Sequence, residues 1–183
     1  MFIRSVTNLS DARYCAGMGV EMIGFCVEQT HPDFVNEMTI QGITGWISGV
    51  KIVAELDVAN NEELITSLNP DMLCLHVESA KLTNREIIYR FSLDEIPEIM
   101  PEPGSLLLIE SIDTEDLKIH YSFIRTLADS FKVILGFGFD TLTIHDLYTD
   151  LHLYGFSMKG GKEIAPGLKT FDELAEILEI IEV

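Results

Sequence analysis

Near its end the sequence reads YGFSMKGGKEIAPGLK (residues 154–169), a short apolar run that enters a Gly-Gly turn. An earlier stretch, VILGFGF (133–139), has the same form, because an apolar run again ends in glycines. Two consecutive strands that each end in glycine predict backbone N–H groups that open toward one shared anion. The loops after the last two strands are also the usual phosphate site of a (β/α)8 barrel. Both stretches therefore favour that fold.

The predicted anion site consists of glycines and one lysine from these two stretches, namely Gly136, Gly138, Lys159, Gly160 and Gly161. Lys162 adds a second cation, and the start of a helix behind a glycine turn favours a negative group. A second interpretation stays open. Glycine is also required wherever a tight turn needs a positive φ, so the same residues could form turns that bind nothing.

Working outward, short apolar runs alternate with amphipathic stretches along the whole chain. Expected strands are 2–6, 21–27, 50–56, 72–77, 86–91, 106–110, 132–136 and 151–157, and expected helices are 11–18, 37–48, 61–68, 114–130, 141–148 and 171–181. Repeated strand-then-helix units favour a parallel sheet with right-handed crossovers. We therefore predict a single α/β domain over residues 1–183, a trimmed (β/α)8 TIM barrel. Its helices should be reduced after the fourth and fifth strands, and an open doubly wound sheet is the alternative.

The charge of the chain limits its partners. With 30 acidic and 12 basic residues, the formal net charge is −18. Phosphate backbones would be repelled, so nucleic acid is not expected as a partner. A small phosphorylated or anionic metabolite remains possible as a partner where local backbone amides and cations outweigh the repulsion from the negatively charged chain. No apolar run approaches the roughly 20 residues that span a bilayer, so no membrane partner is expected.

The cysteines are few and scattered. The sequence contains no CxxC pair and no Cys/His cluster among Cys15, Cys26 and Cys74. We therefore expect reduced thiols in a cytoplasmic protein. Neither a metal nor a cofactor is expected. The amino terminus reads as a strand and lacks the long apolar region of a signal peptide. The sequence leaves the oligomeric state open.

Six stretches then occur in a characteristic order: FIRSVTN (2–8), DA (11–12), IGF (23–25), CLHV (74–77), GFG (136–138) and KGGKEIAPGLK (159–169). They resemble the motifs of the phosphoribosylanthranilate isomerase family of tryptophan biosynthesis. That family begins with a strand like Lys-Ile-Cys-Gly-Ile-Thr-Asn and carries Gln-Leu-His-Gly at its fourth strand. The likeness runs from Ile3 to Lys169 and implies a barrel that isomerises a phosphoribosyl amine by an Amadori rearrangement.

The residues that the resemblance ties to chemistry differ from the family pattern. The family's base is a Cys, and Arg4 occupies its position; a guanidinium stays protonated and cannot accept a proton. The family's acid is an Asp, and the corresponding residue is Glu110. The Arg thought to meet the substrate carboxylate corresponds to Asp33. Three hypotheses follow: an isomerase of the family, a barrel repurposed for another phosphorylated or anionic metabolite, or a relative without catalysis.

Two further residues have alternative roles. Arg4 could clamp an anionic ligand, or it could form an internal ion pair with Glu110, Glu55 or Asp33. His76 ends the fourth strand and could be either a catalytic group or a buried histidine bonded to a neighbouring backbone group.

Overall fold

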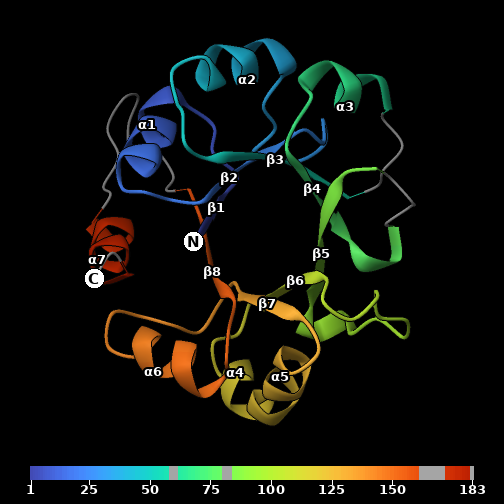
Figure 1. The fold of residues 1–183 in the computed structure, drawn as a ribbon, viewed down its shortest axis with the longest axis vertical. Helices are drawn as coiled ribbons and strands as arrows, with labels where there is room; N and C mark the ends of the chain where they lie inside the picture. The colour runs from blue at the N-terminus through green and yellow to red at the C-terminus, as the bar shows by residue number, and fades with distance from the viewer. Residues whose placement is uncertain (58–61, 80–83, 161–171, 182–183) are drawn as a thin grey trace. The chain divides into compact units, whose positions relative to one another are not determined.

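The computed structural model describes residues 1–57, 62–79, 84–160 and 172–181. Over these residues, eight strands form a closed barrel in the order β1-β2-β3-β4-β5-β6-β7-β8, as labelled in Figure 1. All the strand pairs with a resolved register are parallel. The predicted (β/α)8 barrel is confirmed, and the open-sheet alternative is wrong.

The strands are short and mostly buried. Their bounds are β1 (Phe2–Arg4), β2 (Met22–Cys26), β3 (Lys51–Leu56), β4 (Met72–His76), β5 (Glu86–Ser92), β6 (Leu106–Glu110), β7 (Lys132–Leu135) and β8 (Gly155–Lys159). β2 is buried at every residue and β6 at all but its last. Strands that are covered on both faces read as continuous apolar runs, which is why the sequence revealed them.

The helices of the described residues are α1 (Leu9–Gly17), α2 (Glu37–Thr44), α3 (Glu62–Leu68), α4 (Asp116–Ile119), α5 (Tyr121–Ala128), α6 (Ile144–Asp150) and α7 (Asp172–Ile181). Side-chain oxygens of Asn8 and Asn36 cap α1 and α2 by accepting the N–H groups of Asp11 and Thr39. The helices expected after β4 and β5 are reduced to single 3-10 turns, η1 (Val77–Ser79) and η2 (Leu93–Glu95), among the residues described there. That prediction is confirmed.

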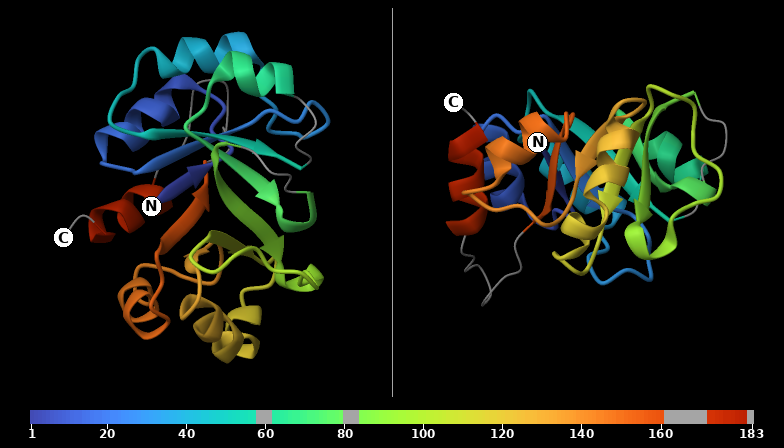
Figure 2. Two further views of the ribbon diagram at one scale, coloured as in Figure 1. Left: turned by 45° about the vertical axis from the view of Figure 1, so that its right-hand side comes forward. Right: turned by 90° about the horizontal axis from the view of Figure 1, so that it is seen from below.

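Two groups of residues are each compact. The first unit contains 1–55, 61–71 and 158–183, and the second contains 56–60 and 72–157. In the first unit, α2 and α3 lie side by side (Figure 2), and the Ser67 hydroxyl of α3 donates to the Glu37 carboxylate of α2. The prediction of one domain over 1–183 stays a prediction.

In the second unit, strand register decides which side chains share a face. Phe91, Ile109, Leu135 and Phe156 are successive register partners on β5, β6, β7 and β8. The Phe156 ring lies 6.4 Å from the Tyr148 ring of α6, centroid to centroid, so this face of the strands meets the helices. Residues one position away on each strand therefore point to the opposite face, which carries no helix.

Several expected boundaries were wrong, including the end of the helix expected over 37–48, which is at Thr44. The last strand is 155–159 rather than 151–157, because Leu151 and Leu153 are buried at the end of α6 instead of in the barrel wall. The long helix expected over 114–130 is two helices that meet at His120, whose φ of −101° leaves the α-helical region. The first helix begins at Leu9 rather than at residue 11, because Asn8 caps it.

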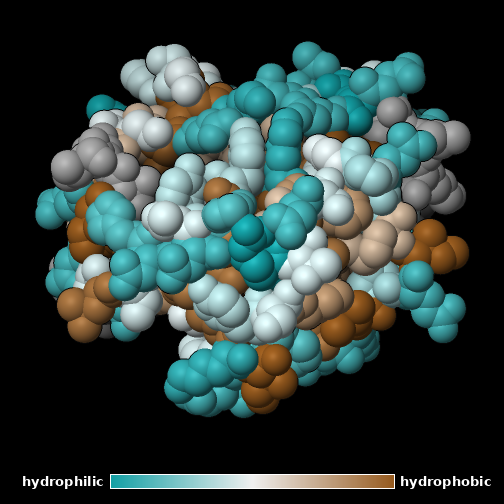
Figure 3. All heavy atoms as spheres, turned by 60° about the horizontal axis from the view of Figure 1, so that its bottom comes forward, coloured by the Kyte–Doolittle hydropathy of each residue, from teal (hydrophilic) through white to brown (hydrophobic). Residues whose placement is uncertain are grey.

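On the face seen in Figure 3, hydrophobic side chains of the described residues form several separate groups among hydrophilic ones. The strongly exposed apolar residues include Met38, Trp46, Ile112 and Leu142. Within the described part of the chain, every helix is too short or too polar to cross a membrane.

The turn before α6 gives a testable prediction. The Asp140 carboxylate accepts hydrogen bonds from the Thr143 hydroxyl at 2.8 Å and from the Thr143 and Leu142 N–H groups, both at 2.9 Å. These bonds, the Thr143 hydroxyl first, lower the pKa of Asp140 below its ordinary value. Such a group adds stability above its unfolded pKa, and that stability is lost as the pH falls through the folded pKa.

Asp140→Ala should therefore lower Tm at neutral pH, and the difference from the unmodified protein should shrink in strong acid. Asp140→Asn keeps an oxygen acceptor and is the matched control with a smaller loss. Thermal unfolding followed from pH 7 to about pH 2, well below the ordinary aspartate pKa of about 3.9, measures this. An equal loss at both ends of the range would contradict the assignment.

Candidate functional site

A buried ion pair joins the end of β1 to β3. The Arg4 Nε lies 3.1 Å from the Glu55 Oε2, and both side chains are 4% exposed. The other carboxylate oxygen accepts the Ser5 N–H at 2.6 Å. Ser5 has a φ of 52°, so the chain turns in the left-handed region where β1 ends. Each hydrogen bond to a charged group contributes about 1.5–3 kcal/mol.

Gly24 makes this pair possible. It lies on β2, between β1 and β3, and its register partner on β3 is Val53. A Cβ at Gly24 would collide with the Glu55 carboxylate and lie 3.0 Å from the Phe2 ring. The missing side chain therefore leaves the space through which Glu55 reaches Arg4. The glycine of the IGF stretch is required here for close approach, not for its backbone conformation.

The pair selects among the interpretations of Arg4. Of the three acids considered from sequence, Glu55 is a partner that the structure records, and the Arg4 side chain is buried. Asp33 instead lies in a local turn, where its N–H donates to the His31 Nδ1 at 3.1 Å. The residue at the position of the family's base thus forms part of a closed structural contact.

Glu110 lies at the end of β6 in the second unit. Its Oε2 is 3.9 Å from the Arg90 Nε, and its side chain is 25% exposed. The Arg90 Nη2 also contacts the Asp57 Oδ1 at 2.5 Å. Arg90 therefore lies between two carboxylates. Sequence reasoning placed Glu110 correctly at the end of a strand but did not identify this arginine.

His76 shares the face of Arg90. The two are register partners on β4 and β5, while Ser92 and Glu110 are partners on β5 and β6. Since Arg90 and Ser92 are two residues apart, all four side chains belong to the face that carries no helix. The His76 ring is half-buried, and among the described residues it has no hydrogen-bond or ion-pair partner. The interpretation of His76 as a histidine bonded to a neighbouring group is therefore not supported.

The glycines after β7 differ from each other. The Gly136 N–H donates to the Ile109 carbonyl at 2.9 Å and so continues the sheet. Gly138 has a φ of 73°, and a Cβ there would lie 3.1 Å from the Leu117 side chain. Within the described residues its N–H has no acceptor. Of these two glycines, only Gly138 has a positive φ that favours glycine. It is also the one whose N–H has no acceptor within the described residues.

At the end of β8, the Gly160 N–H donates to the Arg4 carbonyl at 2.7 Å. This amide is engaged by the protein and does not face a ligand. Lys159, the residue before it, is exposed. Gly161 and Lys162 lie outside the described residues.

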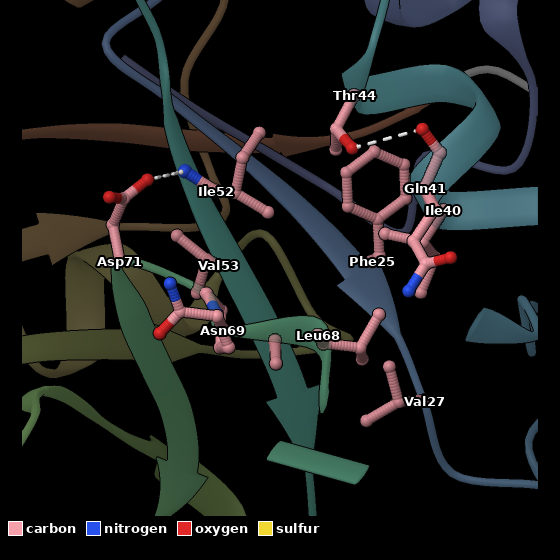
Figure 4. A pocket seen from close by; sticks show the side chains of 12 residues that line it. Phe25, Val27, Ile40, Gln41, Thr44, Ile52, Val53, Leu68, Asn69 and Asp71 are labelled. Carbon is pink, nitrogen blue, oxygen red and sulfur yellow. Dashed lines mark hydrogen bonds between the residues drawn. The ribbon is translucent and has the colours of Figure 1, made fainter. Parts of the chain in front are cut away.

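A pocket of about 160 Å³ lies on the helix side of β2 and β3 (Figure 4). Apolar side chains from the strands, including Phe25 and Ile52, meet Ile40 of α2 and Leu68 of α3. The Asp71 carboxylate at its edge accepts the Ile52 N–H at 2.7 Å. The predicted site residues are absent from its lining. Among the described residues, there is also no group of His, Cys, Asp and Glu that could hold a metal ion.

Sequence reasoning missed Arg90 and the space at Gly24. Arg90 is a charged residue inside the otherwise apolar run IIYRF (87–91), two positions from the end of its strand. Charged residues are rarely buried in strands unless they are paired, so this interruption was a usable signal. Nothing in the sequence marked Gly24 as the gap between two charged side chains.

Known proteins with sequence or structural similarity to this chain match it along nearly its whole length. No family model matches the chain. It is 20% identical to the N-(5'-phosphoribosyl)anthranilate isomerase of Sulfurihydrogenibium sp. (strain YO3AOP1), over 98% of this chain and 97% of that protein. The solved structure of TrpF from Jonesia denitrificans has a TM-score of 0.74 at 17% identity, covering 99% and 95% of the two chains.

Two further solved structures are similar to the same extent. Phosphoribosyl anthranilate isomerase from Thermus thermophilus has a TM-score of 0.72 at 19% identity, and the coverage is 99% of this chain and 97% of that chain. A phosphoribosyl anthranilate isomerase in complex with reduced 1-(o-carboxyphenylamino)-1-deoxyribulose 5-phosphate has a TM-score of 0.72 at 14% identity, with the same coverage. These structures share the fold. Together they show that this chain is a (β/α)8-barrel protein.

The sequence likeness also runs along the full length of the chain, at 20% identity to the curated relative. The chain is therefore similar in fold and in overall sequence to phosphoribosylanthranilate isomerases, and it has Arg4 where the resemblance puts the usual Cys.

The Arg4–Glu55 pair gives a prediction for stability. Glu55→Ala leaves a buried guanidinium and the Ser5 N–H without their acceptor, and breaking a buried pair in this way costs about 3–5 kcal/mol. The double variant Arg4→Met/Glu55→Leu removes both charges and should recover most of that loss. Urea unfolding of Arg4→Met, Glu55→Leu and the double variant measures the coupling. Additive losses would show that the two side chains do not interact.

Proposed function

We propose that this protein binds a small phosphorylated metabolite and does not carry out the family's Amadori isomerisation efficiently. The observation that carries the proposal is the buried Arg4–Glu55 ion pair at the position of the family's base. A group that takes a proton from a substrate carbon must be unprotonated and within reach of that carbon. Arg4 meets neither condition, because it is a guanidinium directed at Glu55.

Binding of a phosphate is supported by residues in each unit. In the second unit, the Gly138 N–H is held in a positive-φ turn and has no acceptor among the described residues. In the first unit, Lys159 is exposed at the end of β8. Backbone amides and cationic side chains are each groups that bind phosphate in an acidic protein. The solved relative with a bound 5-phosphate ligand adds support from the family.

The second candidate is a working isomerase of tryptophan biosynthesis. One observation favours it: Glu110 retains a partly exposed carboxyl group where the resemblance puts the family's acid. A protein that has the acid but no base still lacks catalysis of the proton-abstraction step. General-base catalysis accelerates that step about 10²–10⁴-fold. The first candidate therefore fits the described residues better.

An activity measurement separates the two candidates. The purified protein should have a kcat/KM for phosphoribosylanthranilate at least about 10²-fold below that of a relative that carries the usual Cys. It should also fail to complement a tryptophan auxotroph that lacks this isomerase. Arg4→Cys alone should not restore turnover, because it leaves the Glu55 carboxylate buried without its partner. Turnover by the unmodified protein near that of the relative would refute the proposal.

Phosphate binding is tested separately. Inorganic phosphate should raise Tm, and Lys159→Gln should reduce that shift because it removes the exposed cation after β8. Lys118→Gln is the matched control, since Lys118 is also exposed but pairs with Glu115. No shift with phosphate, or equal shifts in the two variants, would count against the site.

A further inference from the structure

The pocket beneath α2 and α3 exists because α3 ends early. Asn69 follows α3 with a φ of 44°, and its N–H donates to the Ile65 carbonyl at 3.0 Å. A residue in the left-handed region that makes such a bond is a common end of a helix, and a proline after it cannot continue the helix. The pair Asn69-Pro70 therefore stops α3 at Leu68.

The end of α3 lies beside the first turn of α2, because the Ser67 hydroxyl donates to the Glu37 carboxylate. The non-helical segment 69–71 then continues along α2, and it lines the pocket together with the second half of that helix. Ile52 of β3 also lines the pocket and is only half-buried, although it lies on the helix side of the barrel wall. The early end of α3 thus leaves a space over β3 that a longer helix would cover.

This space has the size and the lining of a site for a small apolar molecule. Its volume is about 160 Å³. A cavity of about 150 Å³ that is lined by Leu, Ile and Phe side chains binds benzene. Figure 4 shows the apolar side chains of the present pocket around a common space, and they include Phe25, Val27, Ile40, Ile52 and Leu68.

The polar residues of the pocket lie at its surface and do not suit an anion. Gln41, Asn69 and Asp71 are exposed, so a ligand can enter from solvent. Of the 12 described residues that line the pocket, Asp71 alone is charged. A ligand carboxylate would therefore be buried among apolar groups without a cation in the lining, which is costly. A hydroxyl group can instead stay at the exposed polar edge while the apolar part of the ligand fills the pocket.

We infer that this pocket is a separate binding site for a small uncharged molecule, whose aromatic or branched aliphatic body is about the size of benzene. All the lining residues belong to the first unit, so the site lies within one compact unit. Gly138 and Lys159, which support the phosphate proposal, are absent from the lining. The inference therefore does not depend on the proposed function.

Benzyl alcohol and benzoate test the inference with the unmodified protein, because they share an aromatic ring and differ in charge. In NMR titrations of the methyl groups, benzyl alcohol should shift the signals of Ile40, Ile52 and Leu68 and leave Ile134 of β7 unchanged. Its Kd should be at least about tenfold lower than that of benzoate, because burial of an unpaired carboxylate is costly. Unshifted pocket methyl groups, or equally tight binding of benzoate, would overturn the inference.

A variant that fills the pocket locates the ligand. Ala54→Val adds two methyl groups to the pocket wall and should raise the Kd for benzyl alcohol at least about fivefold, because close-packed interiors leave little spare volume. Ala128→Val is the control. It makes the same change on α5, outside the pocket, and should leave that Kd unchanged. Binding by Ala54→Val that is as tight as in the unmodified protein would place the ligand elsewhere and overturn the inference.

Discussion

The site of this protein depends on one ion pair that crosses β2. Arg4 and Glu55 come from β1 and β3, and they meet because Gly24 on β2 has no side chain. The same carboxylate holds the Ser5 N–H at the turn where β1 ends. Because buried charges are costly unless paired, neither residue can change alone without a large loss of stability. The constraint links three strands and holds Arg4, the residue that the resemblance puts at the position of the family's base, in a buried ion pair.

The second unit shows a related arrangement with a different consequence. Arg90 also lies between acids, but Asp57 and Glu110 are partly exposed, and His76 beside them has no partner among the described residues. Breaking a buried ion pair is strongly destabilising, whereas the partly exposed charges beside Arg90 remain in contact with solvent. In our proposal, the ion pair in the first unit is what prevents efficient isomerisation.

Much of the fold could be predicted from the sequence, because parallel strands covered on both faces give continuous apolar runs and the family motifs occur in order. The errors were local. Leu151 and Leu153 continue an apolar run past α6 without entering a strand, and His120 interrupts a helix that periodicity alone would continue. Side-chain partners were harder to predict. Three acids were equally plausible as ion-pair partners of Arg4. The sequence does not specify strand register, and it is the register that brings Glu55 to Arg4. Arg90 was visible as a break in an apolar strand, but its two partners come from segments far away in the sequence.

The most direct test of the central claim is hydrogen exchange of the Arg4 Nε–H, followed by NMR in the absence of ligand and with ribose 5-phosphate. A guanidinium N–H that is buried and bonded to Glu55 should exchange slowly, and its signal should not move when ligand is added. Glu55→Gln should alter that signal strongly, because the charged acceptor is lost. Fast exchange in the free protein, or a large shift on addition of the ligand, would contradict the account and make Arg4 a ligand-binding residue.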